Sequence, residues 1–224
     1  MAEADRPLSL VVLISGRGSN LSAILDAIGA GDLHATVLAV IATRGDADGL
    51  ACARAAAIDT LALDAADYPD RDAYDRALQG LIDRFSPDLV VLAGFMRILS
   101  AGFVRHYCGR LINIHPSLLP QLRGLNTHQR ALDAGLREHG ASVHFVTEEL
   151  DSGPVIIQVR VPVEAGDSAA GLAARVLDQE HRLYVRALQL LAAGEVAWRD
   201  GHIYYHNQAL TQPLQLDADS LKAS

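Results

Sequence analysis

The sequence is short of cysteine, of long hydrophobic runs and of basic residues, and each shortage excludes a class of protein. Its two cysteines, Cys52 and Cys108, are too few for a disulfide framework and are typical of a reducing compartment. The apolar stretch 8–14 is too short to span a bilayer, and it leads into a glycine-rich turn instead of a signal-peptide cleavage site. We therefore expect a cytoplasmic protein that does not bind a membrane.

Acidic residues outnumber basic ones: the chain has 27 Asp and Glu against 19 Lys and Arg, for a formal net charge of -8. Proteins that bind nucleic acid concentrate Lys and Arg on one face, so we expect no nucleic-acid partner. A local pocket of an acidic protein can still hold a small anion. Hydrophobic residues make up 50% of the 224, which is enough for the buried core of one globular α/β domain.

Short runs rich in Val, Leu and Ile alternate with longer Ala-rich stretches. This alternation predicts parallel βαβ units, and the continuous apolar character of the runs predicts strands covered by helices on both faces. The predicted strands span 8–14, 37–42, 60–63, 89–94 and 111–115. The predicted helices span 20–30, 47–57, 70–85, 127–138 and 169–193. The predicted fold class is therefore α/β, a Rossmann-like open twisted sheet with a parallel N-terminal half.

From residue 141 the pattern changes, and "ASVHFVT" and "VIIQVRVPV" indicate sheet strands joined by the turn "LDSGP". These strands are expected to make the C-terminal part of the sheet mixed. No linker composition interrupts the chain, so we expect a single domain over 1–210 and a polar, loosely held tail over 211–224. The domain divides into an N-terminal half, a C-terminal half and a hairpin, at about 8–100, 101–195 and 196–206.

The turn after the first predicted strand, "SGRGSN", places Gly16 and Gly18 between a buried strand and a helix that opens at Ser19 or Asn20. Free N–H groups at a helix N-terminus, with glycines that allow close approach, suit a phosphate. The dinucleotide fingerprint is incomplete, because Leu21 replaces its third glycine and no acidic residue ends the second strand. A tight turn without any ligand is the alternative interpretation.

Two polar residues, Asn113 and His115, end the fifth predicted strand, and Pro116 follows them. Residues two apart on a strand share a face. Ligands of open α/β sheets lie beyond the carboxyl ends of the strands, where the strand order reverses, so we expect this pair and the turns after the first and fourth strands to line one cleft. An amide and an imidazole in that cleft suit a carbonyl that becomes an oxyanion.

The remaining polar residues include a candidate acid, the other histidines and Glu180. Asp151, in the turn "EELDSGP", is the candidate acid beside His115, because a nearby carboxylate favours the imidazolium. In the alternative interpretation Asn113 caps a turn and His115 hydrogen-bonds a backbone carbonyl.

None of the nine histidines has the spacing of a metal site, so we expect no metal. Glu180 lies in the last predicted helix, and the pattern alone places it on a solvated face.

Taken in order, "VVLISGRGSNL", "VVLAGFMRILS", "INIHPSLLP" and "GASVHFVTEELDSGPVIIQ" resemble the folate-dependent phosphoribosylglycinamide formyltransferases of purine synthesis, and the likeness runs from about residue 8 to 195. The resemblance implies the formyltransferase fold, and transfer of a formyl group from 10-formyltetrahydrofolate to the amine of phosphoribosylglycinamide. It implies two small-molecule substrates for a monomer or a homodimer. The N-terminal half would bind phosphate, and the C-terminal half would hold the catalytic and folate sites.

The resemblance also implies roles for individual residues. Asn113 would polarise the formyl oxygen, His115 would stabilise or protonate it, and Asp151 would support the charged imidazole. The phosphoribosylglycinamide site would comprise Gly18, Ser19, Asn20 and Glu180, of which Glu180 would hold the amine. The folate site would comprise Arg71, Met96, Arg97, Ile98, Leu99, Asn113, Thr147, Glu148, Glu149, Leu150 and Asp151.

Some positions depart from that family. Gln121 and Arg123 stand where many bacterial relatives have Lys and Pro, so the loop 121–128 is expected to differ in flexibility or in how it covers the substrate. Leu177 stands where some relatives carry a polar residue beside the glycinamide. None of these positions belongs to the proposed catalytic group.

Four other functions are alternatives. Formyltransferases of initiator methionyl-tRNA and formyltetrahydrofolate hydrolases share similar segments, but they normally carry a further domain, and we expect no room for one between a first strand at residue 8 and an end at residue 224. The incomplete glycine fingerprint opposes a nicotinamide oxidoreductase. A non-catalytic nucleotide-binding module would not require Asn113, His115 and Asp151 together.

Overall fold

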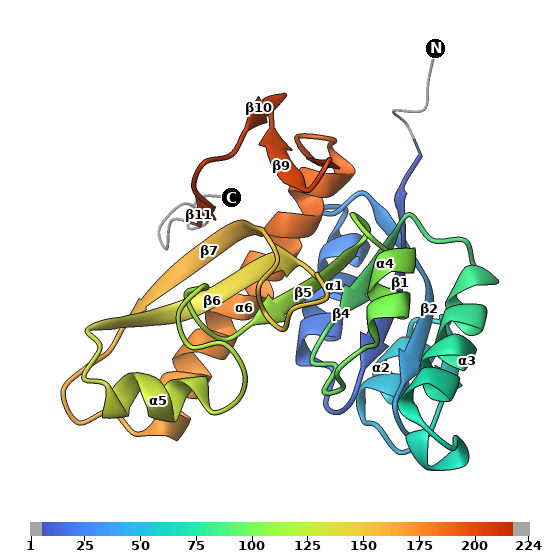
Figure 1. Ribbon diagram of the computed structural model, residues 1–224, viewed down its shortest axis with the longest axis horizontal. Coiled ribbons are helices and arrows are strands. Elements are labelled where there is room, and N and C mark those ends of the chain that lie inside the picture. Colours follow the sequence, from blue (N-terminus) through green and yellow to red (C-terminus); the bar gives the residue numbers. More distant parts are fainter. Residues whose placement is uncertain (1–5, 217–224) are drawn as a thin grey trace.

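The computed structural model describes residues 6–216, and a twisted eight-stranded sheet forms its centre (Figure 1). The strands of this sheet are β1 (Leu8–Ile14), β2 (Ala35–Ala42), β3 (Asp59–Ala62), β4 (Leu89–Leu92), β5 (Leu111–His115), β6 (Glu138–Phe145), β7 (Val155–Pro162) and β11 (Leu214–Gln215). Their order is β11-β7-β6-β5-β4-β1-β2-β3. Strand β1 lies between β2 and β4, so the strand order reverses beside β1, which is the position where ligands of such sheets bind.

The predicted change from a parallel to a mixed sheet is confirmed. Strands β1 to β5 pair in parallel, β6 pairs antiparallel with β5 and β7, and β11 pairs parallel with β7. The antiparallel step has a consequence for function. The last four residues of β6 pair with β5, from Ser142 opposite His115 to Phe145 opposite Ile112, and the turn that carries Asp151 follows.

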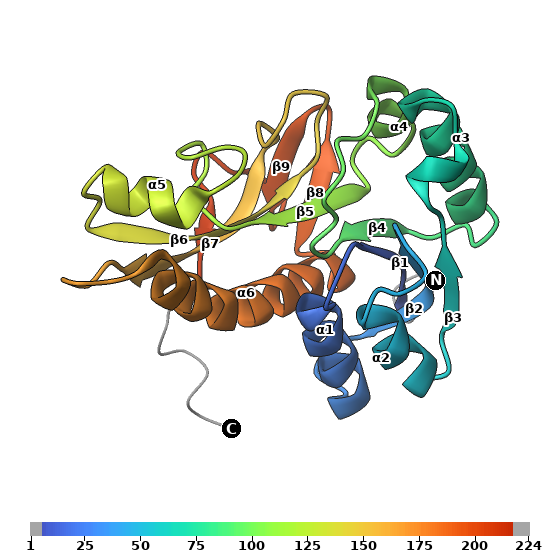
Figure 2. The same cartoon turned by 90° about the horizontal axis from the view of Figure 1, so that it is seen from below.

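Helices cover both faces of the sheet, as Figure 2 shows. On one face lie α1 (Ser19–Ala30), α2 (Gly49–Ala55) and α6 (Ala169–Ala192), and on the other lie α3 (Arg71–Asp83) and α4 (Ala101–His106). Strand β1 serves both layers, because Leu10 and Val12 pack toward the first group and Val11 and Leu13 toward the second. This two-sided burial explains why its sequence is continuously apolar.

Two helices differ from the predicted ranges: one is shorter, and the other is additional. The helix predicted over 127–138 is α5 (Thr127–Asp133), because Gly135 takes a left-handed φ of 61° and β6 begins at Glu138. Helix α4 did not appear among the predicted helices, and Ser100 caps it by accepting the N–H of Phe103. A 3-10 turn spans Ala65–Asp67. Across residues 6–216, no helix is both long and apolar enough to cross a lipid bilayer.

The C-terminal segment contains the predicted hairpin, but part of the predicted loose tail is packed. The hairpin of β8 (Val196–Arg199) and β9 (His202–Tyr205) turns at Asp200 and Gly201, and β10 (Gln208–Ala209) adds a third strand. Strand β11 then returns to the edge of the main sheet, where Leu216 is buried. The part of the expected tail from 214 to 216 is therefore packed, and residues 217–224 lie outside the described residues.

Candidate active site

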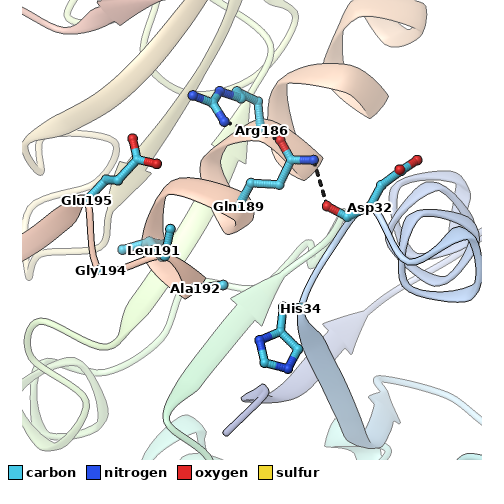
Figure 3. Close-up of a pocket in the computed structure, with 9 residues that line it drawn as sticks. Asp32, His34, Arg186, Gln189, Leu191, Ala192, Gly194 and Glu195 are labelled. Carbon is cyan, nitrogen blue, oxygen red and sulfur yellow. Dashed lines mark hydrogen bonds between the residues drawn. The ribbon is translucent and has the colours of Figure 1, made fainter. Parts of the chain in front are cut away.

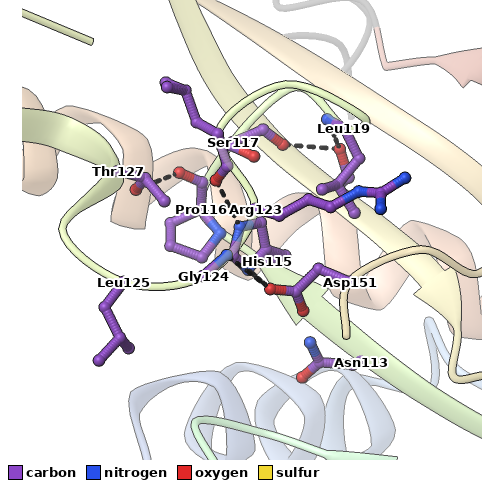
Figure 4. A network of polar contacts seen from close by, with 12 residues as sticks. Asn113, His115, Pro116, Ser117, Leu119, Arg123, Gly124, Leu125, Thr127 and Asp151 are labelled. Carbon is purple, nitrogen blue, oxygen red and sulfur yellow. Dashed lines mark hydrogen bonds and ion pairs between the residues drawn. The ribbon is translucent and has the colours of Figure 1, made fainter. Parts of the chain in front are cut away.

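Asn113 and His115 end strand β5, and Asp151 comes to them from the turn after β6 (Figure 4). His115 Nδ1 lies 3.5 Å from Asp151 Oδ2, and both side chains are nearly buried, with 8% and 9% of their surface exposed. Strand β6 ends beside the beginning of β5, with Phe145 opposite Ile112, and the turn that follows returns Asp151 to His115. The structure thus places the three candidate catalytic residues in one group.

The second nitrogen of His115 has a partner that the sequence did not single out. His115 Nε2 lies 3.1 Å from the carbonyl oxygen of Leu122, and Gly124 N–H donates to Asp151 Oδ2 at 2.9 Å. A carbonyl oxygen only accepts, so Nε2 of His115 must carry a hydrogen to bond with Leu122. Contact with a carbonyl was the structural alternative for His115, and here it accompanies the contact with the acid.

A buried polar network holds the loop that follows His115. Ser142 Oγ donates to the Ser117 carbonyl at 2.7 Å and accepts the Leu119 N–H at 3.0 Å. Gln158 Nε2 donates to the Leu119 carbonyl at 2.9 Å, and Thr127 Oγ1 donates to the Pro116 carbonyl at 2.6 Å. Satisfied buried networks of this kind restrict backbone position, so the exit path of β5 is firmly set.

The first glycine turn is shaped by backbone packing. Gly18 has a left-handed φ of 73°, and a Cβ added to it would lie 2.7 Å from Gly49 Cα. Gly49 N–H donates to the Gly16 carbonyl at 3.1 Å, which joins this turn to the start of α2. Glycine at position 18 is therefore required for conformation and close approach, whether or not an anion binds the N-terminus of α1.

Asn20, in the first turn of α1, contacts Glu180 of α6 although 160 residues separate them. Asn20 Nδ2 donates to Glu180 Oε2 at 3.1 Å, and both side chains are buried. Burial raises the pKa of the Glu180 carboxyl from 4.5 to about 7. Asn20 Oδ1 is buried without a hydrogen-bond partner. The pattern-based placement of Glu180 on a solvated face is wrong, because α1 packs against that side of α6.

The segment 96–99 follows β4 and lies beside the glycine turn. Ser15 Oγ accepts the Met96 N–H at 2.9 Å, and the Ser15 N–H donates to the Gly94 carbonyl at 3.1 Å. Met96 and Ile98 expose 69% and 62% of their surface. Large apolar side chains so exposed can contact an apolar ligand ring. Leu99 is half-buried against the α3 and α4 layer.

Two further predicted folate residues lie near helix α3. The Arg97 guanidinium stacks over the Tyr74 ring at 4.4 Å. Arg71, the first residue of α3, is exposed and lines a cleft of about 500 Å³ together with Arg76 and Arg105. In the described part of the chain, no hydrogen bond or ion pair joins Arg71 to the group of Asn113, His115 and Asp151.

The loop 147–151 is tied at several points. Glu148 pairs with Arg105 at 2.9 Å, and Glu149 accepts the Ser152 hydroxyl at 2.8 Å. Thr147 Oγ1 donates to the Glu149 carbonyl at 3.3 Å, while the Leu150 side chain points to solvent, 51% exposed. These contacts restrict the position of the turn that carries Asp151.

A second cavity, of about 820 Å³, lies near the start of β2, at the end of the parallel strands opposite to the predicted site (Figure 3). His34, directly before β2, lines it with Asp32 and the end of α6, where Gln189 Nε2 donates to the Asp32 carbonyl at 3.0 Å. Parallel strands begin at this edge, and ligands of such sheets bind at the other one. None of the predicted site residues lines this cavity.

Comparison with known proteins supplies the family. Residues 8–188 match the family model described as Formyl transferase. The chain belongs to the formyl transferase family. Among relatives of this formyl transferase, phosphoribosylglycinamide formyltransferase of Escherichia coli (strain K12) is 54% identical over 200 residues, which cover 87% of this chain and 94% of that protein.

Solved structures agree with the fold of this formyl transferase. The phosphoribosylglycinamide formyltransferase of Coxiella burnetii, in complex with CHES, is 46% identical with a TM-score of 0.90, and the match covers 95% of this chain and 100% of that one. A formyltetrahydrofolate deformylase from Pseudomonas syringae pv. tomato str. DC3000 is 27% identical with a TM-score of 0.83, over 90% of this chain and 67% of that one.

Two positions that depart from the expected family pattern have visible surroundings in this formyl transferase. Arg123 pairs with Glu149 at 2.7 Å, so it links the loop 121–128 to the loop 147–151. Leu177 is half-buried on α6.

Within residues 6–216, no group of three or more His, Cys, Asp and Glu residues is arranged so that it could hold a metal ion.

Proposed function

We propose that this formyl transferase transfers the formyl group of 10-formyltetrahydrofolate to the amine of 5-phosphoribosylglycinamide, giving formylglycinamide ribonucleotide and tetrahydrofolate in purine synthesis. The observation that carries the proposal is the juxtaposition of Asn113, His115 and Asp151 at the switch-point edge of the sheet. The similarity to phosphoribosylglycinamide formyltransferases over nearly their whole length supports the choice of substrate.

The catalytic group stabilises the negative charge that develops on the formyl oxygen. When the amine attacks the formyl carbon, that oxygen gains negative charge, and the Asn113 N–H and His115 N–H groups stabilise it. The oxyanion then collapses, the bond from the formyl carbon to the folate nitrogen breaks, and the proton lost by the amine passes to that nitrogen. Asp151 favours the charged form of His115. His115 Nε2 faces the Leu122 carbonyl, so it reaches a substrate oxygen only after exchanging that partner.

The phosphoribosylglycinamide site is assigned to the Asn20 and Glu180 pair and the adjoining turn. Glu180 Oε2 is occupied by Asn20, so the other oxygen, Oε1, accepts an amine N–H. The unpartnered Asn20 Oδ1 is a second acceptor within the same buried pair. The phosphate binds at Gly18, Ser19 and the N-terminus of α1.

The donor site is assigned to the segment 96–99, Arg71 and the loop 147–151. In this assignment one domain, residues 1–210, divides its work: the half from about 8 to 100 binds phosphate, and the half from about 101 to 195 holds the catalytic and folate residues. The enzyme acts in the cytoplasm, as a monomer or a homodimer, without a metal ion.

The proposal is tested by mixing the purified protein with 10-formyltetrahydrofolate and phosphoribosylglycinamide and measuring both products by mass spectrometry. Both products are expected in equal amounts, and only when both substrates are present. Tetrahydrofolate and formate formed without the amine would instead identify a deformylase. A reaction mixture containing a nicotinamide cofactor serves as control for the oxidoreductase alternative.

A further inference from the structure

His144, which the sequence did not single out, lies directly across from Asn113 in the β5–β6 pair. It is buried, with 2% of its surface exposed. Its Nδ1 lies 2.9 Å from the carbonyl oxygen of Phe145, and its Nε2 lies 3.2 Å from Asn113 Nδ2. Each ring nitrogen of His144 therefore lies within hydrogen-bond distance of one polar atom.

These two partners determine which nitrogen carries the hydrogen. A carbonyl oxygen only accepts, so Nδ1 must be protonated to bond with Phe145. An amide nitrogen only donates, so Nε2 must present its lone pair to Asn113. Asp151 Oδ1 lies 3.9 Å from Nε2, which is beyond hydrogen-bond distance. The contacts thus select the neutral, Nδ1-protonated tautomer.

The reverse orientation of the Asn113 amide has a clear cost. If Oδ1 faced His144, the ring would have to donate from both nitrogens and carry a charge. Burial lowers the pKa of the His144 imidazole and so opposes that charge. Burial and geometry therefore favour the same arrangement, in which the nitrogen of Asn113 points to His144.

We infer that His144 is a positioning residue that orients the Asn113 amide, so that one N–H of Asn113 is held by His144 Nε2 and the other is directed to the substrate oxygen. This inference rests on the proposed function. Two imidazoles then flank one carboxylate: Nδ1 of His115 lies 3.5 Å from Asp151 Oδ2, and His144 accepts the Asn113 N–H through Nε2. A fixed amide needs no reorientation when charge develops on the oxygen.

The tautomer is tested without any catalysis, by nitrogen NMR of protein labelled at the histidine ring nitrogens. His144→Gln assigns the signals of His144 among the nine histidines. The expected spectrum at neutral pH shows a protonated Nδ1 and an unprotonated Nε2. A protonated Nε2, in either the neutral or the charged ring, overturns the inference and leaves the proposed function untouched.

The positioning role is tested by formyl-transfer kinetics of His144→Leu and His144→Gln. The leucine variant lacks the acceptor and is expected to lower kcat about 10-fold or more, with KM for both substrates changed less than about 3-fold. The glutamine variant places an amide oxygen near the position of Nε2 and is expected to regain much of the loss. A glutamine variant no better than the leucine variant contradicts the inference.

A double-mutant comparison separates positioning from general support of the fold. In the Asn113→Ala background, His144→Leu is expected to cause no further loss of kcat, because the group it orients is absent. Equal losses in both backgrounds overturn the inference. Absence of transfer by the unmodified protein would instead reject the proposed function, so the two failures are distinguishable.

Discussion

Replacing Glu180 with glutamine is expected to stabilise the protein while impairing its activity. The carboxyl is buried, and its only hydrogen-bond donor in the described residues is Asn20 Nδ2. A glutamine amide keeps an acceptor for that donor, and its NH₂ group can bond the unpartnered Asn20 Oδ1. The variant exchanges a carboxylate that is costly to bury in charged form for a neutral amide with a reciprocal partner.

The magnitude follows from the raised pKa. Unfolding returns the carboxyl to a pKa near 4.5, whereas in the folded protein it is about 7, so the folded state binds the proton more tightly. Stability of the unmodified protein therefore falls as pH rises from about 4.5 to about 7 and is level above that. At about 1.4 kcal/mol per pH unit, ionisation of Glu180 costs about 3 kcal/mol at pH 8.

The assay is urea unfolding of both proteins at pH 5 and pH 8. The stability gained by Glu180→Gln is expected to be larger at pH 8 than at pH 5 by about 2 kcal/mol. Asp26→Asn, on the exposed side of α1, is the matched control and should show no such difference. An equal gain at both pH values would contradict a raised pKa of the buried Glu180 carboxyl. In the transfer assay, KM for phosphoribosylglycinamide should rise.

The remaining predictions concern the catalytic group and the glycine turn. His115→Ala is expected to lower kcat by about 100-fold or more, and near-normal turnover would make His115 structural. Asn20→Ala is expected to raise KM for phosphoribosylglycinamide, and an unchanged KM would place the phosphorylated substrate elsewhere. Gly18→Ala is expected to cost about 2 kcal/mol or more in urea unfolding, because of its φ of 73° and the 2.7 Å approach to Gly49; an unaltered midpoint would contradict this.

Much of the fold could be predicted from local patterns. The continuous apolar run of β1 indicated two-sided burial, and the glycines after it indicated a turn into a helix. Asn113 and His115 could be placed on one face because the strand period is two. Helix boundaries were less predictable: α5 ends at Asp133, where Gly135 and the pairing of β6 take over.

Local sequence is enough to predict the alternation of strands and helices, the shared face of Asn113 and His115 and the glycine turn, since each depends on residues within a few positions of one another. The burial of Glu180 against Asn20 and the contact of His144 with Asn113 arise only when distant elements pack together. Those contacts depend on how α6 packs on α1 and how β6 registers with β5. Packing and strand register are settled by the summed burial of whole elements, which no short stretch of sequence contains.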